Sequence, residues 1–184
     1  MSRVWEFFLA DGFEEIEGLT VVDILRRAGI DISMISINGK KKVTGAHGIA
    51  LDTDEDIVQC DPDKLDMLVL PGGMPGTTNL AACEKLTEAL KKADQEKRGI
   101  AAICAAPSVL GDLGFLKGKK AVCYPGFESR LTGVEVLAVP VVTDGHITTS
   151  RGMGTAIAFA LELTKRLKDE ETAKQVSRSI LYNV

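Results

Sequence analysis

Two side chains in this sequence have the type and the setting of a reacting pair, and the first is Cys104. It directly follows the short apolar segment 99–103, and small residues and a proline come after it. A cysteine at such a strand-to-helix turn projects from the carboxyl edge of a sheet, and a helix N-terminus beside the sulfur favours the nucleophilic thiolate. We therefore expect Cys104 to be either a nucleophile with a lowered pKa or a small core residue, as free cysteines commonly are.

The second candidate is Glu17, which lies on a helix predicted over residues 13–28. At about 100° per residue, its side chain falls within the apolar stripe of that helix. Glu15 points to the opposite side and Glu14 lies at the edge of the stripe. Because burial raises the pKa of a carboxyl group, Glu17 is a candidate acid that keeps its proton. We interpret Glu14 and Glu15 as first-turn acids that complement the helix dipole.

A pair of adjacent glycines, Gly72 and Gly73, follows the apolar segment 65–70. Glycines at this place let backbone N–H groups approach a ligand, as an oxyanion hole requires, although they are also ordinary turn residues. The segment is not a Walker loop, because no Gly-Lys-Ser/Thr follows it. The two histidines, His47 and His146, lie in turn-like contexts, and we expect both at the surface.

The elements that must position these residues alternate between strand and helix. Strands are predicted over 4–9, 30–37, 65–70 and 99–103, with further candidates over 121–124 and 134–139. Helical patterns cover 13–28, 83–97, 109–113 and 156–167, a short ribbon covers 43–51, and a hairpin covers 141–148. Short apolar strands between helices predict a mostly parallel sheet with helices on both faces. Ligands bind such sheets at the carboxyl ends of strands, so we expect the site after residues 9, 70 and 103.

Composition narrows the function further. The chain has 184 residues, a size typical of one domain, and we treat 1–184 as a single domain. Its net charge of −4 argues against nucleic-acid binding, and its apolar runs are too short for a membrane span. The four cysteines form no C-x-x-C pair, and with no export signal visible we expect a cytoplasmic protein with free thiols. The spacings indicate neither a metal site nor an organic cofactor.

Five segments together resemble the ThiJ/PfpI superfamily, in the branch of the Parkinson-disease-associated protein deglycase and its bacterial relatives. Each is weak alone, but they occur in family order over nearly the whole chain. They are LADGFEEIE (9–17), LRRAG (25–29), VLPGG (69–73), AAICAAP (101–107) and TSRGMGT (149–155).

The resemblance implies a flavodoxin-like three-layer α/β sandwich and a homodimer. It implies that Cys104 is the reactive nucleophile at a strained elbow and that Glu17 is the protonated carboxyl that hydrogen-bonds its sulfur. The backbone amides of Gly73 and Ala105 would form the oxyanion pocket, with Gly72 supporting the turn.

Two departures from the family pattern restrict the chemistry. Ala105 stands where the protease branch has a histidine, so we expect no peptidase activity. Tyr124 stands where some closer members have a histidine, so proton transfer would rest on Glu17. Further candidates for the pocket are His47, Tyr124 and Arg27.

We therefore expect an enzyme that handles small reactive aldehydes or glycated substrates, as a glutathione-independent glyoxalase or a deglycase. The alternative is an oxidative-stress sensor or redox-regulated chaperone in which Cys104 is oxidised to the sulfinate. A third hypothesis is a binding module in which Cys104 is inert.

Overall fold

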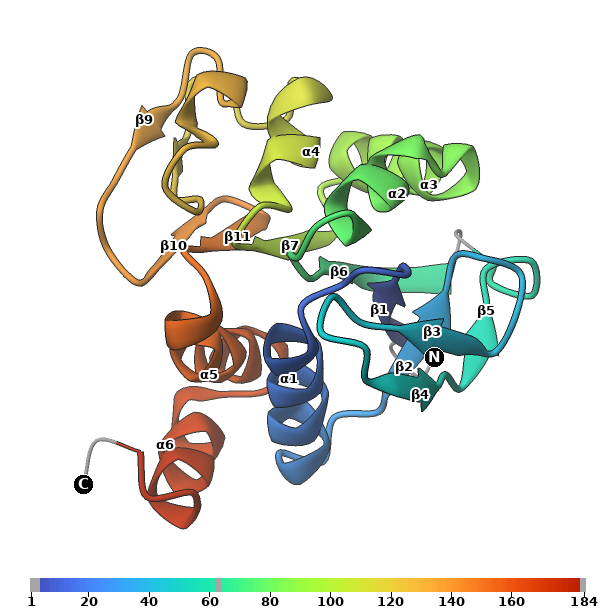
Figure 1. Cartoon of the computed structure of the whole chain (residues 1–184). Coiled ribbons are helices and arrows are strands. Elements are labelled where there is room, and N and C mark those ends of the chain that lie inside the picture. Colours follow the sequence, from blue (N-terminus) through green and yellow to red (C-terminus); the bar gives the residue numbers. More distant parts are fainter. Residues whose placement is uncertain (1–3, 62–63, 183–184) are drawn as a thin grey trace.

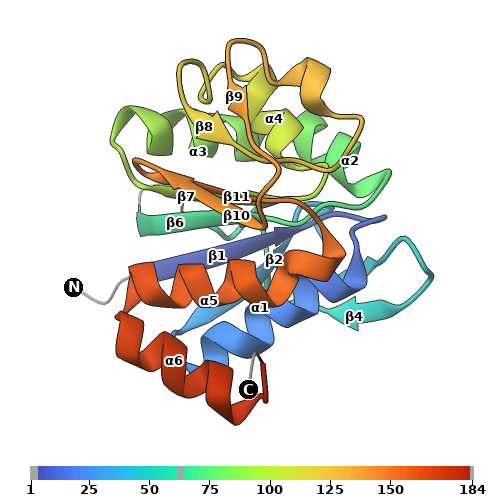
Figure 2. The ribbon, with the colours of Figure 1, turned by 90° about the vertical axis from the view of Figure 1, so that its left-hand side faces the viewer.

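The structure, a computed structural model, describes residues 4–61 and 64–182 of the chain. A central sheet separates two layers of helices, as Figures 1 and 2 show. This three-layer α/β arrangement confirms the predicted flavodoxin-like class.

The central sheet contains seven strands in the order β10-β11-β7-β6-β1-β2-β5. Their bounds are β1 Val4–Leu9, β2 Ile32–Ser36, β5 Glu55–Asp56, β6 Leu65–Leu70, β7 Gly99–Ile103, β10 Val141–Asp144 and β11 Ile147–Ser150. Neighbouring strands run parallel, except that β10 and β11 form the predicted antiparallel hairpin. Strands β1, β6 and β7 lie side by side, so the three strand ends proposed for the site meet at one edge of the sheet.

Two small ribbons flank the main sheet. One is the predicted ribbon, formed by β3 (Lys42–Thr44) and β4 (Ala50–Asp52). The other pairs β8 (Lys120–Ala121) with β9 (Glu135–Val136). The candidate strands over 121–124 and 134–139 are thus much shorter than predicted.

Helices α1 (Glu15–Arg27) and α5 (Ala156–Leu167) cover one face of the sheet, and α6 (Glu170–Ser179) packs outside α5. Helices α2 (Gly76–Ala82), α3 (Glu84–Gln95) and α4 (Pro107–Asp112) lie over the other face. The sequence analysis assigned no element to α2 or α6. Helix α6 buries Ala173 and Val176, and its other residues are polar, so its apolar face is narrow.

The two faces of the sheet at β1 show why residues 7–10 are all apolar. Phe7 and Leu9 pack with α1 and α5, whereas Phe8 and Ala10 pack with the helices on the opposite side. Because both faces are covered, consecutive residues of a central strand are all buried. Among the described residues, no helix combines the length and the apolar character needed to cross a membrane.

The core between α5 and the sheet gives a stability prediction. Leu163 on α5 is fully buried in this core, so we expect Leu163→Ala to lower the free energy of unfolding by about 2–5 kcal/mol. Leu181 is the matched control because its side chain is 79% exposed, and Leu181→Ala should change little. Urea unfolding measures both, and equal losses would contradict this packing.

Candidate active site

Cys104 occupies a strained turn between β7 and α4. Its φ of 65° lies in the left-handed region, which residues other than glycine rarely adopt. Two backbone hydrogen bonds hold it there: Cys104 N donates to Ser150 O at 2.9 Å, and Tyr124 N donates to Cys104 O at 2.8 Å. Segments from β11 and from the region after β8 therefore fix the direction of the thiol.

The half-buried Cys104 thiol lies in the wall of a cavity of about 540 Å³. The cavity lies at the carboxyl edge of the sheet, where β7 and β11 end. Its lining residues are Glu14, Glu17, His47, Gly73, Cys104, Tyr124, Pro125, Arg151, Gly152, Met153, Gly154 and Thr155. The sulfur can thus be reached from solvent.

Glu17 and Cys104 meet at Gly72. Glu17 is fully buried, and its Oε2 accepts a hydrogen bond from Gly72 N at 2.8 Å. A Cβ on Gly72 would lie 2.5 Å from Cys104 Cβ, 3.0 Å from its sulfur and 2.7 Å from Glu17 Oε2. Only the lack of a side chain at this position allows the thiol and the carboxyl group to approach each other.

The surroundings of Glu17 keep a proton available at neutral pH. Burial raises the pKa of Glu17 to about 7, although the Cys104 side chain and the Gly72 amide act in the opposite direction. Because Oε2 accepts from Gly72, we place the proton on Oε1. Oε1 is buried and has no hydrogen-bond partner by distance and angle. The proton is therefore free to move towards a group that enters the cavity.

The acidity of Cys104 differs from the sequence prediction. Burial, followed by the charge of Glu17, raises the pKa of the Cys104 thiol to about 12, whereas the amides of Ala105 and Gly73 lower it. The predicted net lowering of the thiol pKa was wrong, because burial and the charge of Glu17 outweigh the effect of the neighbouring amides. The resting sulfur is a neutral thiol next to a carboxyl group that titrates near pH 7.

The other predicted site residues divide into two groups. Gly73, Tyr124 and His47 line the cavity, and the Ala105 amide lies close enough to the sulfur to affect its pKa. Arg27 does not line the cavity: it lies in the last turn of α1 and pairs with Asp23 at 2.6 Å. Its inclusion was wrong, since the cavity adjoins the opposite end of that helix.

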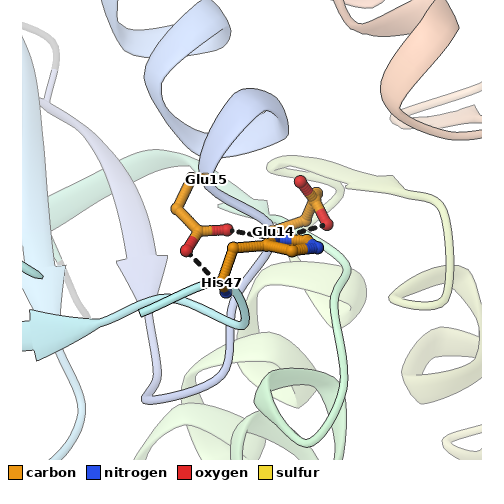
Figure 3. Close-up of side chains that lie close together, drawn as sticks. All are labelled: Glu14, Glu15 and His47. Carbon is orange, nitrogen blue, oxygen red and sulfur yellow. Dashed lines mark hydrogen bonds and ion pairs between the residues drawn. The ribbon is translucent and has the colours of Figure 1, made fainter. Parts of the chain in front are cut away.

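Glu15 was predicted to point outward, but its side chain is only 4% exposed. It lies beside His47, as Figure 3 shows. Its Oε1 accepts a hydrogen bond from His47 N at 2.8 Å, and its Oε2 lies 2.9 Å from His47 Nδ1. The loop between β3 and β4 covers the side of α1 that a helical wheel assigns to solvent. Burial raises the pKa of Glu15, but the hydrogen bonds from the His47 side chain and from backbone groups outweigh it and lower the pKa overall.

The two histidines lie in different surroundings. His47 is exposed at the rim of the cavity, and its interaction with Glu15 raises its pKa. His146 was expected at the surface but is buried, with Nε2 2.8 Å from Asp94 Oδ1. The four cysteines are free, as predicted.

Glu14 and Arg151 also line the cavity, although Glu14 was expected to act only on the helix dipole and the segment 151–155 was expected mainly to form a tight helix entry. The pairing of strands explains why Arg151 lies in the cavity. Arg151 directly follows β11, and β11 pairs in parallel with β7, which ends just before Cys104. Two parallel neighbours bring their carboxyl ends to the same place, but this pairing cannot be read from the hairpin sequence alone.

The raised pKa of Glu17 predicts how stability depends on pH. The unfolded chain releases this proton near pH 4.5 and the folded chain near pH 7, so wild-type stability should fall between these values and stay lower above them. The difference corresponds to about 3 kcal/mol. Glu17→Gln removes the charge, so its free energy of unfolding should exceed that of the wild type by a growing margin up to pH 7. A constant margin from pH 4 to 8 in urea unfolding would contradict the shift.

The close approach at Gly72 predicts the effect of a single methyl group. Gly72→Ala should lower the free energy of unfolding by about 1–3 kcal/mol, because the methyl group would overlap Cys104 and Glu17. Gly154→Ala is the control for stability, since a Cβ there meets no atom within 4 Å. Urea unfolding of both variants measures the difference, and equal stabilities would show that the site tolerates a side chain at Gly72.

The chain is similar to known proteins over most of its length. The chain is 39% identical over 176 residues to Protein DJ-1 homolog A from Arabidopsis thaliana, covering 94% of this chain but only 45% of that protein. It is 33% identical over 161 residues to a deglycase from Pyrococcus abyssi, covering 86% of this chain and 96% of the relative. The structure of oxidized Toxoplasma gondii DJ-1 matches with a TM-score of 0.95 at 34% identity, covering 100% of both chains.

The model of the DJ-1/PfpI family matches residues 4–166, which include Glu17, Gly72 and Cys104. Relatives above 30% identity match nearly the whole chain as well. The chain therefore belongs to the DJ-1/PfpI family.

Proposed function

We propose that this protein converts small reactive carbonyl compounds, such as methylglyoxal or its adducts with amines, without glutathione or an organic cofactor. The observation that carries the proposal is the buried Glu17 carboxyl beside the Cys104 thiol in a cavity open to solvent. The name of the P. abyssi relative, a deglycase of the same family, supports it.

The first step uses the Glu17 carboxylate as a general base. Its pKa of about 7 suits this role, because an effective base has a pKa close to the working pH. The carboxylate takes the proton of the Cys104 thiol as the sulfur attacks the aldehyde carbon. A C–S bond forms, the C=O π bond breaks, and the product is a hemithioacetal with its charge on oxygen.

The later steps return the proton. The amides of Gly73 and Ala105 stabilise the oxyanion until it is protonated. For methylglyoxal, Glu17 assists transfer of the proton on the former aldehyde carbon to the neighbouring carbon. This gives a thioester of lactate without net oxidation. Water hydrolyses the thioester and regenerates the Cys104 thiol. For a hemiaminal adduct with an amine, the sulfur attacks the carbon that carries the nitrogen, so that a C–S bond forms and the C–N bond breaks. Protonated Glu17 supplies the proton with which the amine leaves, and the product is the same hemithioacetal.

The proposal includes a homodimer in the cytoplasm. Ile16 and Leu19 are exposed three residues apart on α1, and Ile49 is exposed in the β3–β4 loop, which contacts the start of that helix. A second copy would cover such an apolar patch. The free cysteines fit a reducing compartment.

The alternative, an oxidation sensor or redox-regulated chaperone, uses the same sulfur. The relative from T. gondii is known in an oxidized form, which supports this alternative for the family. In this chain, however, the raised pKa of Cys104 weighs against rapid oxidation, because peroxide reacts with the thiolate rather than the thiol.

Lactate formation from methylglyoxal tests the enzymatic proposal. Cys104→Ser should abolish turnover, and Glu17→Gln should lower kcat/KM by about 10²–10⁴-fold, because it removes the base. For the wild type, kcat/KM should fall as pH drops through about 7, since protonated Glu17 cannot accept the thiol proton. Glu17→Gln should lack this inflection.

Cys83→Ser is the control for turnover, because Cys83 lies at the junction of α2 and α3, outside the cavity. Turnover by Cys104→Ser at the wild-type rate would refute the mechanism. Intact-mass measurements after graded peroxide treatment distinguish the oxidation sensor from the enzyme. Two added oxygen atoms on Cys104, in a protein that makes no lactate, would favour sensing.

A further inference from the structure

Three ligand-type side chains, Glu14, Glu15 and His47, lie close together (Figure 3), and Glu14 and His47 line the Cys104 cavity. Glu14 and Glu15 come from the start of α1, and His47 comes from the loop between β3 and β4. One donor atom from each lies within 4.8 Å of the other two. His47 Nδ1 is 2.9 Å from Glu15 Oε2 and 3.7 Å from Glu14 Oε2.

The cluster keeps one negative charge even when His47 is protonated, because it contains two carboxylates and one imidazole. The side chain of Glu15 is 4% exposed and that of Glu14 is 16% exposed, so both carboxylates are largely removed from water. Within residues 4–61 and 64–182, their ion-pair partner is His47, and no lysine or arginine pairs with either carboxylate. A buried and a half-buried carboxylate that share one imidazole favour an additional cation.

The separations suit a small transition-metal ion. Zn²⁺ binds imidazole nitrogen and carboxylate oxygen at about 2.0–2.2 Å, so two ligands at a tetrahedral angle stand roughly 3.3–3.5 Å apart. The distances from His47 Nδ1 to the two carboxylates bracket this value. One histidine with two carboxylates is also a donor set that divalent zinc, cobalt and related ions accept.

A second observation indicates that the same cavity receives a polar ligand. Glu17 Oε1 is fully buried in the cavity wall and has no hydrogen-bond partner by distance and angle. Ordered water or a bound group usually completes such an atom, and its neighbour here is the Cys104 thiol, with which the Glu17 side chain interacts. Glu14 and His47 line this cavity together with Glu17 and Cys104.

We propose that Glu14, Glu15 and His47 bind one Zn²⁺ ion at the rim of the cavity, with the fourth coordination position open towards Cys104. The ion replaces the proton between His47 Nδ1 and Glu15 and neutralises the pair of carboxylates. Three protein ligands with one open position are typical of zinc sites that bind water or a substrate oxygen. A carbonyl oxygen bound there would lie in the cavity that contains the thiol.

Metal titration of the untagged full chain, after EDTA treatment and dialysis, tests the proposal. Isothermal titration with Zn²⁺ should give one ion per chain. His47→Gln and Glu14→Gln should each weaken binding by more than about 10-fold, because each removes a ligand. These two variants carry the test, since Glu15 also holds the β3–β4 loop and Glu15→Gln could loosen the fold.

The controls match the ligands in residue type. Glu84→Gln removes an acid from the first turn of another helix, and His146→Gln removes the other histidine. Both should bind Zn²⁺ as the wild type does, as should Cys104→Ser. Circular dichroism checks that each variant is folded.

Co²⁺ absorption identifies the ligands directly. Visible d–d bands without a near-ultraviolet thiolate-to-cobalt band would support the three-residue site. A thiolate band, or loss of binding in Cys104→Ser, would place the metal on the thiol and overturn the proposal. It would equally be overturned if the protein bound no Zn²⁺, or if His47→Gln bound it as tightly as the wild type. Since lactate formation is not measured, failure here leaves the proposed function unaffected.

Discussion

The contact between the Glu17 carboxyl group and the Cys104 thiol is the constraint on which the rest of the site depends. A carboxyl group can remain in the apolar stripe of α1 because Gly72 donates a hydrogen bond to it and because its raised pKa lets it hold a proton. The sulfur reaches it because the chain turns sharply at Cys104 and carries no side chain at Gly72. The buried carboxyl group, the sharp turn at Cys104 and the glycine at position 72 therefore depend on one another.

Much of the fold could be predicted from the sequence, because its central strands are buried on both faces. Their runs of apolar residues, as in 65–70 and 99–103, stand out against the flanking glycines, and the structure places β6 and β7 at these bounds. The position of Glu17 was predictable for a related reason: a charged residue within an apolar stripe is conspicuous. Weakly apolar or very short elements, such as α6 and β5, gave no such signal.

The electrostatic features could not be predicted, because they depend on contacts between distant segments. The burial of Glu15 follows from a loop more than thirty residues away that folds over α1. The raised pKa of Cys104 results from burial combined with the charge of Glu17, and a local rule about helix N-termini includes neither. Arg27 was wrongly predicted to line the cavity for the same reason. It lies in a segment that resembles the family, but that resemblance does not show which end of α1 faces the cavity.

The way the Cys104 turn is held has a consequence for biosynthesis. Its backbone partners, Tyr124 and Ser150, come 20 and 46 residues later in the chain. While the protein is being synthesised, the sulfur therefore emerges from the ribosome well before the segments that fix its direction. A nascent chain that ends before β11 contains the cysteine but not its final arrangement, so the reactive geometry is a property of the nearly finished polypeptide.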